Sequence, residues 1–290
     1  MNYLVTGGAG FIGSHLAELI RDKGYKVSIY SRHTPDPKWF DPIGIDVLEG
    51  DVMNKEQLKE AAKDKDAIFD CAGVLGSAET YAFIDKTIET NILGTLNGLE
   101  VARELGIPFI FLSLKNEWRN PYMISKRAGT ELCEMFSQYM DTKAISIRGL
   151  NAYGPRQHWH PVRKMFPNFI YRLLTGQPIQ IFGDGKQIVD MIYVTDMAEI
   201  MWRAYEYKQW GKVIDAGSGI PRTVKEVAEL LVSKIGGRIE YIPMRQGEPH
   251  HAIALANPAD VKQNLDFYPE VLWEDGVEKS IAWYKELLKK

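Results

Sequence analysis

The first half of the chain alternates short apolar runs with longer segments that carry apolar residues at helical spacing. The apolar runs, typical of buried strands, cover residues 2–6, 26–30, 46–51, 67–71, 107–113 and 143–148. Helical spacing occupies about 11–23, 83–105 and 122–139. Because strands that alternate with helices form parallel sheets covered on both faces, this half predicts an α/β domain with a doubly wound parallel sheet.

The pattern changes after Arg148. Turn-rich stretches occur at 153–156, 182–185 and 216–219, and helices are expected at 224–235 and 276–288. A strand at 191–194 and a helix at 197–207 are expected to return to the first domain. We therefore predict a first domain formed by 1–150 together with about 190–216. A smaller α/β lobe is predicted from about 150–190 and 217–290.

Composition narrows the class of protein. The chain has 290 residues, 45% hydrophobic and 25% charged, with a formal net charge of −3 and no basic stripe, which argues against a nucleic-acid partner. Only two cysteines occur, Cys71 and Cys133, which is typical of a reducing compartment. No apolar run is long enough to span a bilayer, and the first strand begins at residue 2. We expect a cytoplasmic protein with no membrane partner.

A glycine-rich turn joins the first strand to the first helix. Gly7, Gly10 and Gly13 stand there at the spacing of a dinucleotide-binding turn, with Phe11 and Ile12 between the last two. The first glycine permits the turn, the second lets backbone amides approach a pyrophosphate, and the third lets helix and strand pack closely. The helix N-terminus adds partial positive charge. The turn predicts a dinucleotide cofactor and a Rossmann-type sheet.

The residues after the second strand bear on which cofactor binds. An acidic residue there binds the ribose hydroxyls of NAD(H), but this strand ends in Ser31 and Arg32, which can bind a 2′-phosphate. We therefore favour NADP(H) and leave NAD(H) open, since Arg32 could stack on the adenine of either. Asp51, after the third strand, is either a partner of the adenine amino group or the N-cap of a helix starting near Lys55.

Tyr122 and Lys126 lie four residues apart on one predicted helix, so they share a face. A tyrosine, with a pKa near 10, exchanges protons poorly at neutral pH. A neighbouring ammonium favours the phenolate and brings the pKa toward the working range. The pair therefore predicts a catalytic acid/base, Tyr122, tuned by Lys126.

These strings together resemble the extended short-chain dehydrogenase/reductases, specifically the NAD(P)-dependent sugar-nucleotide epimerase/dehydratase family. Thr6 to His15 resembles the cofactor turn, Asn91 to Asn97 a mid-domain helix, and Pro121 to Lys126 the catalytic helix. Residues 148–155, 182–185, 190–196 and 243–248 resemble the substrate-lobe signatures. The resemblance implies a redox enzyme that is a homodimer formed by the Asn91 and Tyr122 helices. The expected cofactor-binding residues are Gly7, Gly10, Phe11, Ile12, Gly13, Ser31, Arg32, Asp51, Val52, Cys71, Ala72, Gly73, Asn91, Tyr122 and Lys126.

The resemblance also implies a substrate-binding set in the second lobe. Asn151 and Arg245 stand where the family grips the substrate's diphosphate, and Arg245 offers the bidentate fork that a phosphate needs. Lys164 and Gln180 fall near the nucleotide-contact positions, although each could equally be a surface residue. The expected partner is a small molecule, a sugar nucleotide.

The chain departs from the family pattern at the strand end. Where the family has a second hydroxyl, this chain has Leu114, so Ser113 could act in catalysis only if the strand end shifts by one residue. Only eight residues separate Ser113 from Tyr122, a shorter loop than is common, and we expect residues 158–160 (His-Trp-His) to cover the pocket. We expect these histidines to be a lid rather than metal ligands, with no metal site.

Two other departures bear on the substrate and the reaction. Val189 replaces an arginine that would contact the diphosphate, which leaves open a smaller or differently charged substrate. Lys115 and Asn116 replace the acidic residues of 4,6-dehydratases and decarboxylases, which disfavours both reactions. We therefore expect an epimerase that uses a keto-sugar intermediate. The alternatives are an NADPH-dependent ketoreductase and a weakly active NADP(H)-binding sensor or scaffold.

Overall fold

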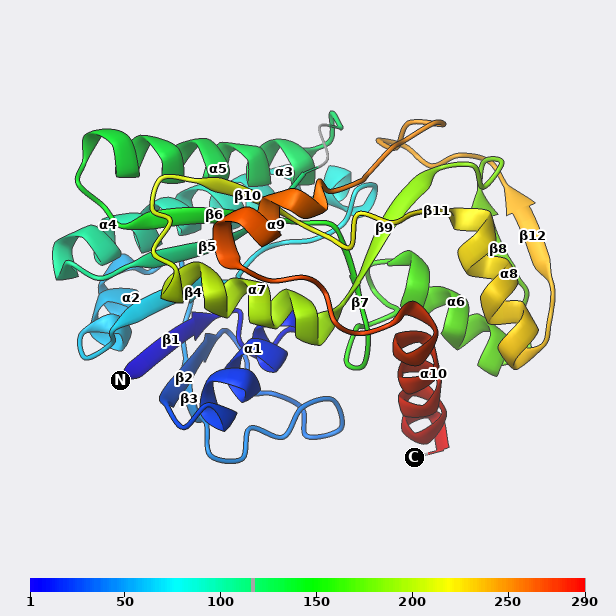
Figure 1. The fold of residues 1–290 in the computed structure, drawn as a ribbon, viewed down its shortest axis with the longest axis horizontal. Helices are drawn as coiled ribbons and strands as arrows, with labels where there is room; N and C mark the ends of the chain where they lie inside the picture. Colours follow the sequence, from blue (N-terminus) through cyan, green and yellow to red (C-terminus); the bar gives the residue numbers. More distant parts are fainter. Residues whose placement is uncertain (116–117, 290) are drawn as a thin grey trace.

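A seven-stranded parallel sheet forms the centre of the first lobe. The computed structural model describes residues 1–115 and 118–289, and the strand order is β10-β6-β5-β4-β1-β2-β3 (Figure 1). This is the doubly wound parallel sheet that the sequence predicts. The strands are β1 (Asn2–Thr6), β2 (Lys26–Ser31), β3 (Asp46–Glu49), β4 (Ala67–Asp70), β5 (Phe109–Leu114), β6 (Ala144–Gly149) and β10 (Val213–Ala216).

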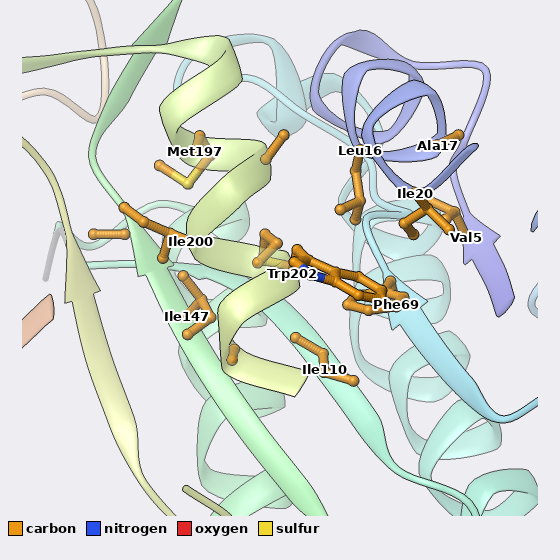
Figure 2. Close-up of a cluster of buried hydrophobic side chains, with 14 of the residues drawn as sticks. Val5, Leu16, Ala17, Ile20, Phe69, Ile110, Ile147, Met197, Ile200 and Trp202 are labelled. Carbon is orange, nitrogen blue, oxygen red and sulfur yellow. The ribbon is translucent and has the colours of Figure 1, made fainter. Parts of the chain in front are cut away.

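Helices cover both faces of this sheet, because side chains alternate along each strand. Tyr3 and Val5 of β1 join one apolar core with α1 (Phe11–Asp22) and α7 (Val194–Glu206), where Trp202 lies against Phe69 (Figure 2). Leu4 joins the core on the other face with α2 (Lys55–Ala62), α4 (Gly94–Leu105) and α5 (Pro121–Tyr139). The two cores fix the carboxyl ends of the strands, where ligands bind in such sheets.

The segment expected as one helix over 83–105 is divided in the structure. A 3₁₀ turn, η1 (Glu79–Ala82), precedes α3 (Ile84–Ile88), and a π-helical turn, η2 (Glu89–Leu93), separates α3 from α4. Periodicity alone does not reveal such a turn, because it covers only five residues within a segment that is otherwise helical. Asn91 lies in the π-helical turn, and its side chain is used at the site described below.

The second lobe contains two small sheets packed against three helices. β7 (Asn151–Tyr153) and β11 (Pro221–Thr223) flank β9 (Ile188–Tyr193), and β8 (Ile179–Phe182) pairs in parallel with β12 (Ile239–Ile242). α6 (Met165–Leu174), α8 (Val224–Ile235) and α10 (Trp273–Lys289) bury their apolar faces against these strands. This lobe lies at the carboxyl end of the large sheet (Figure 1).

The boundary between the lobes differs from the expected division at two points. α7 returns to the large sheet as expected, but β9 pairs with β7 and β11 instead. α9 (Pro258–Leu265), expected in the second lobe, packs on the first, since Val261, Leu265 and Phe267 join its core. No helix in the described parts of the chain is both long and apolar enough to span a membrane.

Candidate active site

The glycine turn between β1 and α1 leaves room for an anion. Gly7 has a φ of +63°, and a Cβ built there would lie 2.7 Å from the carbonyl oxygen of Cys71. A Cβ at Gly13 would lie 2.5 Å from the Gly7 carbonyl oxygen. Side chains at either position would therefore collide with the backbone of the turn or of the loop after β4. Gly10, Phe11 and Ile12 complete this wall of the cleft. The turn fits the pyrophosphate of a dinucleotide.

The residues that follow β2 line the same cleft. The hydroxyl oxygen of Ser31 accepts a hydrogen bond of 3.1 Å from the Ala9 amide, which fixes this loop to the glycine turn. Arg32 is exposed, and no ion pair joins it to another described residue. Its guanidinium is therefore available to a ligand at the adenosine end.

The structure settles one alternative for Asp51. The N-cap of α2 is Asn54, whose side chain accepts a 3.0 Å hydrogen bond from the Gln57 amide. Asp51 instead accepts a 3.0 Å bond from the Met53 amide within its own turn. Asp51 and Val52 both line the cleft, which is compatible with adenine contact.

Asn91 supports the wall of the cleft rather than forming it. Its amide group bonds both backbone groups of Val74, at 2.7 and 3.0 Å, and donates to the Ser125 hydroxyl at 2.9 Å. It is buried and is not among the described residues that line the cleft. Asn91 thus fixes the loop after β4, whose residues Cys71, Ala72 and Gly73 do line it. Burial raises the pKa of Cys71 to about 12, so that the residue is a thiol at neutral pH.

Tyr122 and Lys126 both line the cleft from the first two turns of α5, and both are nearly buried. No hydrogen bond or ion pair joins the phenol or the ammonium to another described side chain. The Nζ of Lys126 lies 4.2 Å from the centroid of the Phe111 ring, and that of Lys164 lies 5.2 Å from the Tyr122 ring centroid. Burial raises the pKa of Tyr122 and lowers that of Lys126. Of these two ammonium groups, the one that lies against the Tyr122 ring is that of Lys164. Burial alone shifts the pKa of Tyr122, and it shifts it upward, opposite to the lowering by Lys126 that the sequence predicts.

Asp70, at the end of β4, is a residue that sequence reasoning missed: it does not line the cleft, but its charge acts on Lys126, which does. Its carboxylate accepts hydrogen bonds from the Thr6 hydroxyl, the Ala72 amide (3.2 Å) and the Thr95 hydroxyl (3.4 Å). Its charge raises the pKa of Lys126, opposing the effect of burial. Burial raises the pKa of Asp70 itself, an effect that the charge of Lys126 opposes. A carboxylate that ends a buried strand was the available signal.

At the end of β5, Leu114 lines the cleft, and the Ser113 hydroxyl is hydrogen-bonded to residues of α5. Ser113 donates to the Lys126 carbonyl at 3.1 Å and lies 2.6 Å from the Thr130 hydroxyl. A catalytic role for Ser113 stays a prediction, and this arrangement does not favour it. The Lys115 ammonium forms a 2.6 Å ion pair with Asp215, whose other oxygen pairs with Arg148 at 2.7 Å. Asn116, which informed the expected reaction, lies outside the described residues.

The four predicted substrate-binding residues all line the same cleft. Asn151 donates weakly to the Asp190 carbonyl at 3.4 Å. Gln180 accepts a 2.8 Å hydrogen bond from Arg163. The guanidinium of Arg245 donates to Glu248 at 2.6 Å and lies 3.7 Å from Glu79. Lys164 is the N-cap residue of α6, and burial lowers its pKa. The structure thus brings the predicted set together from β7, β8, α6 and the loop after β12.

The segment expected as a lid is partly built into the core. His158 stacks on Trp39 with 3.7 Å between ring centroids, and Trp159 stacks on Tyr171 at 4.6 Å. Only the two histidines of the segment line the cleft. A cover over the substrate stays a prediction, since Trp159 is fixed in the second lobe.

One continuous cleft of about 860 Å³ runs from the glycine turn, past Tyr122, to Arg245. That volume is in the upper part of the range for small-molecule sites. It joins a dinucleotide cradle to a basic region in the second lobe. The fold and the cleft define an enzyme of the extended short-chain dehydrogenase/reductase type, and residues of both lobes line the cleft.

Comparisons with known proteins agree with this class. The chain belongs to the NAD dependent epimerase/dehydratase family, whose model matches residues 3–217. A UDP-N-acetyl-alpha-D-glucosaminuronate decarboxylase of Bacillus cytotoxicus is 29% identical, over 98% of both chains.

Two solved structures show the same architecture. A UDP-glucose 4-epimerase of Thermotoga maritima with UDP-glucose is 26% identical, with a TM-score of 0.92 over 99% of this chain and 100% of that one. A Thermus thermophilus UDP-glucose 4-epimerase in complex with NAD is 25% identical, with a TM-score of 0.88 over 98% and 99%. The relatives thus include both epimerases and a decarboxylase of sugar nucleotides.

Proposed function

We propose that this enzyme is a sugar-nucleotide epimerase that works through a keto-sugar intermediate. The observation that carries the proposal is the position of Tyr122 and Lys126, which line one cleft between the glycine turn and the basic second lobe. When bound, a nicotinamide cofactor supplies reversible acceptance of a hydride from a sugar carbon. Tyr122 takes the proton from the hydroxyl on that carbon. It returns the proton after the keto sugar has rotated to present its opposite face. Lys126 stabilises the phenolate during both transfers.

The surroundings of Tyr122 support epimerisation over elimination of water or loss of carbon dioxide. Dehydration needs an acid and a base in addition to the group that oxidises the sugar. The strand end beside Tyr122 supplies Leu114 to the cleft, and Lys115 is held by Asp215. The named decarboxylase among the relatives makes this the first point to test.

Product analysis distinguishes the three reactions. The enzyme is incubated with UDP-glucose, dTDP-glucose or a UDP-uronate, and the products are identified by NMR. Inversion at C4 of the sugar without loss of carbon is the expected result. Release of carbon dioxide from the uronate, or a 4-keto-6-deoxy product, would overturn the epimerase assignment. Net oxidation of NADPH with a keto sugar, without inversion, would instead favour the ketoreductase.

Replacing Tyr122 with phenylalanine tests its role. Loss of the proton-transfer group is expected to lower kcat about 10²–10⁴-fold, with little change in the Kd of the cofactor. Tyr139→Phe, at the exposed end of the same helix, is the matched control and is expected to keep full activity. Wild-type turnover by Tyr122→Phe would contradict the assignment.

For the cofactor, we propose a preference for NADP(H) over NAD(H). Its support is Arg32, an exposed guanidinium with no carboxylate partner in the described chain, beside Ser31. A 2′-phosphate would receive charge-assisted hydrogen bonds there.

Arg32→Ala is expected to raise the Kd of NADP⁺ about tenfold and to leave that of NAD⁺ unchanged, as measured by calorimetry. Arg127→Ala, on the surface of α5, is the control. Tighter binding of NAD⁺ by the wild type would reverse the preference.

A homodimer formed through α4 and α5 is also proposed. These helices pack side by side on the outer face of the sheet (Figure 1). Leu93, Ile124 and Met135 are exposed on η2 and α5. Exposed apolar side chains on neighbouring helices support an interface at this face.

A further inference from the structure

Three cations meet in the second-lobe end of the cleft with only two carboxylates between them. Arg163, Lys164 and Arg245 all line the cleft there. Glu248 forms an ion pair with Arg245, and Glu79 lies 3.7 Å from the same guanidinium. In the described chain no carboxylate forms an ion pair with the side chain of Arg163 or Lys164. The cluster therefore keeps uncompensated positive charge, which an anionic ligand would neutralise.

Both terminal nitrogens of the Arg245 guanidinium already have partners. One terminal nitrogen donates to Glu248 at 2.6 Å, and the other lies near Glu79 and donates to the Arg163 carbonyl at 3.4 Å. The Nε of Arg245 is buried without a hydrogen-bond partner. Arg245 is thus arranged to hold the loop of Arg163 in place, and only part of its donor set remains for a phosphate.

Arg163 is fixed in the same cluster with most of its donors free. One terminal nitrogen donates to Gln180 at 2.8 Å, and the Arg163 amide donates to Glu79 at 3.0 Å. Its guanidinium carbon lies 5.4 Å from the centroid of the Phe182 ring, and that of Arg245 lies 5.0 Å from the same centroid. Two guanidinium groups are therefore held beside one ring. The other N–H groups of Arg163 have no partner among the described residues.

Val189 bears on the role of this cationic cluster. This β9 side chain lines the cleft where the family pattern has an arginine, so the strand contributes no charge to the ligand. We propose that Arg163 supplies the missing cation, binding the diphosphate of a nucleoside-diphosphate substrate together with Lys164, while Arg245 positions Arg163 through Glu79 and its own contact with the Arg163 carbonyl. This inference rests on the proposed function and identifies the residues that select a diphosphate.

Like charges support the same conclusion. Burial lowers the pKa of both Arg163 and Lys164. The charge of Arg172 lowers that of Arg163 further, the charge of Arg245 lowers both, and Glu79 opposes these effects. A bound dianion would offset this repulsion, and α6 begins directly after Lys164 with no side-chain cap on its first amides. The partial positive charge of that helix end adds to the attraction.

Binding of UDP tests the proposal. Calorimetry is performed with UDP on the wild type, Arg163→Ala and the control Arg238→Ala, an exposed arginine directly before β12. Arg163→Ala is expected to weaken UDP binding about 10- to 100-fold, the size of a lost charge-assisted hydrogen bond, and Arg238→Ala to have no effect. Equal UDP affinity of Arg163→Ala and the wild type would overturn the proposal.

A second substitution separates a charge role from a purely structural one. Val189→Arg is added to Arg163→Ala, restoring a cation on β9. Recovery of UDP affinity in the double variant is expected if either arginine can serve the diphosphate. A stable double variant, as judged by its Tm, that stays as weak as Arg163→Ala would show that Arg163 only supports Gln180 and Phe182. Failure of the wild type to bind UDP, dTDP or GDP would instead refute the proposed function.

Discussion

His15 illustrates how one side chain of the glycine-turn helix depends on both lobes. It lies buried on α1, with Nδ1 2.9 Å from the Phe11 carbonyl oxygen. Burial, together with the charge of Arg156, lowers its pKa to about 3. Arg156 belongs to the loop after β7 and pairs with Glu18 of α1. A neutral histidine is thus enclosed where the two lobes meet.

The depressed pKa of His15 predicts loss of stability in acid. The unfolded chain binds a proton near pH 6.5 and the folded chain only near pH 3, so protons favour unfolding throughout that window. The contribution is complete above pH 7 and falls by about 3 kcal/mol on going to pH 4. Urea unfolding should show that the stability difference between wild type and His15→Gln shrinks over this range. A difference independent of pH would contradict the prediction, and His33→Gln, at an exposed position, is the control.

At the scale of elements, the start of α5 joins Tyr122 and Lys126 to the second lobe. Asn120 is the N-cap, and its side chain accepts a 2.9 Å hydrogen bond from the Met123 amide. The same side chain donates to the Gly247 carbonyl at 3.0 Å, two residues after Arg245. One buried amide therefore sets both the beginning of the Tyr122 helix and the position of the Arg245 loop.

Removing this cap is expected to cost both stability and activity. Asn120→Ala should lower the free energy of unfolding by about 1 kcal/mol and reduce kcat, because Tyr122 lies in the first turn. Asn54→Ala, which removes the cap of α2 away from Tyr122, should lower stability by a similar amount and leave kcat unchanged. Thermal melts and steady-state kinetics measure the two effects. Equal kcat for Asn120→Ala and the wild type would show that the cap does not position Tyr122.

At the scale of the whole molecule, a buried carboxylate holds distant segments together. Asp190 of β9 accepts hydrogen bonds from the amides of Ser218, Gly219 and Ala256, at 2.6, 2.9 and 3.0 Å, and from the Ser218 hydroxyl at 2.7 Å. These bonds tie β9, which carries Val189, to the loop after β10 and to the segment before α9. Three separate parts of the chain therefore meet at Asp190 in the second lobe.

The proposed dimer predicts a change of mass on substitution. Light scattering after size exclusion should give twice 33.0 kDa for the wild type. Ile124→Glu, which places a charge on the exposed face of α5, should shift the mass toward the monomer. Ile220→Glu, exposed in the second lobe, is the control. A wild type that is monomeric at micromolar concentration would contradict the proposed interface.

The spacing of apolar and glycine residues along the chain predicted the features that depend on sequence neighbours. Alternating apolar runs predicted the parallel sheet, and the glycine spacing predicted the turn, whose Gly7 has a positive φ. The four-residue spacing predicted that Tyr122 and Lys126 share a helix face, and both line the cleft. The π-helical turn at Glu89–Leu93 and the place of α9 were not predicted, because they depend on packing against elements far away in sequence.

The sequence by itself determined the two-lobed class of fold, the glycine turn and the helix that carries Tyr122 and Lys126, because hydrogen bonding and burial along a strand or helix follow the order of residues. Only the tertiary structure decided which charges meet. The charge of Asp70 acts on Lys126, and Arg163 meets Arg245 and Glu79 from three separate parts of the chain. Electrostatic interactions depend on the distance between groups in space, and the spacing of residues along the chain does not give that distance.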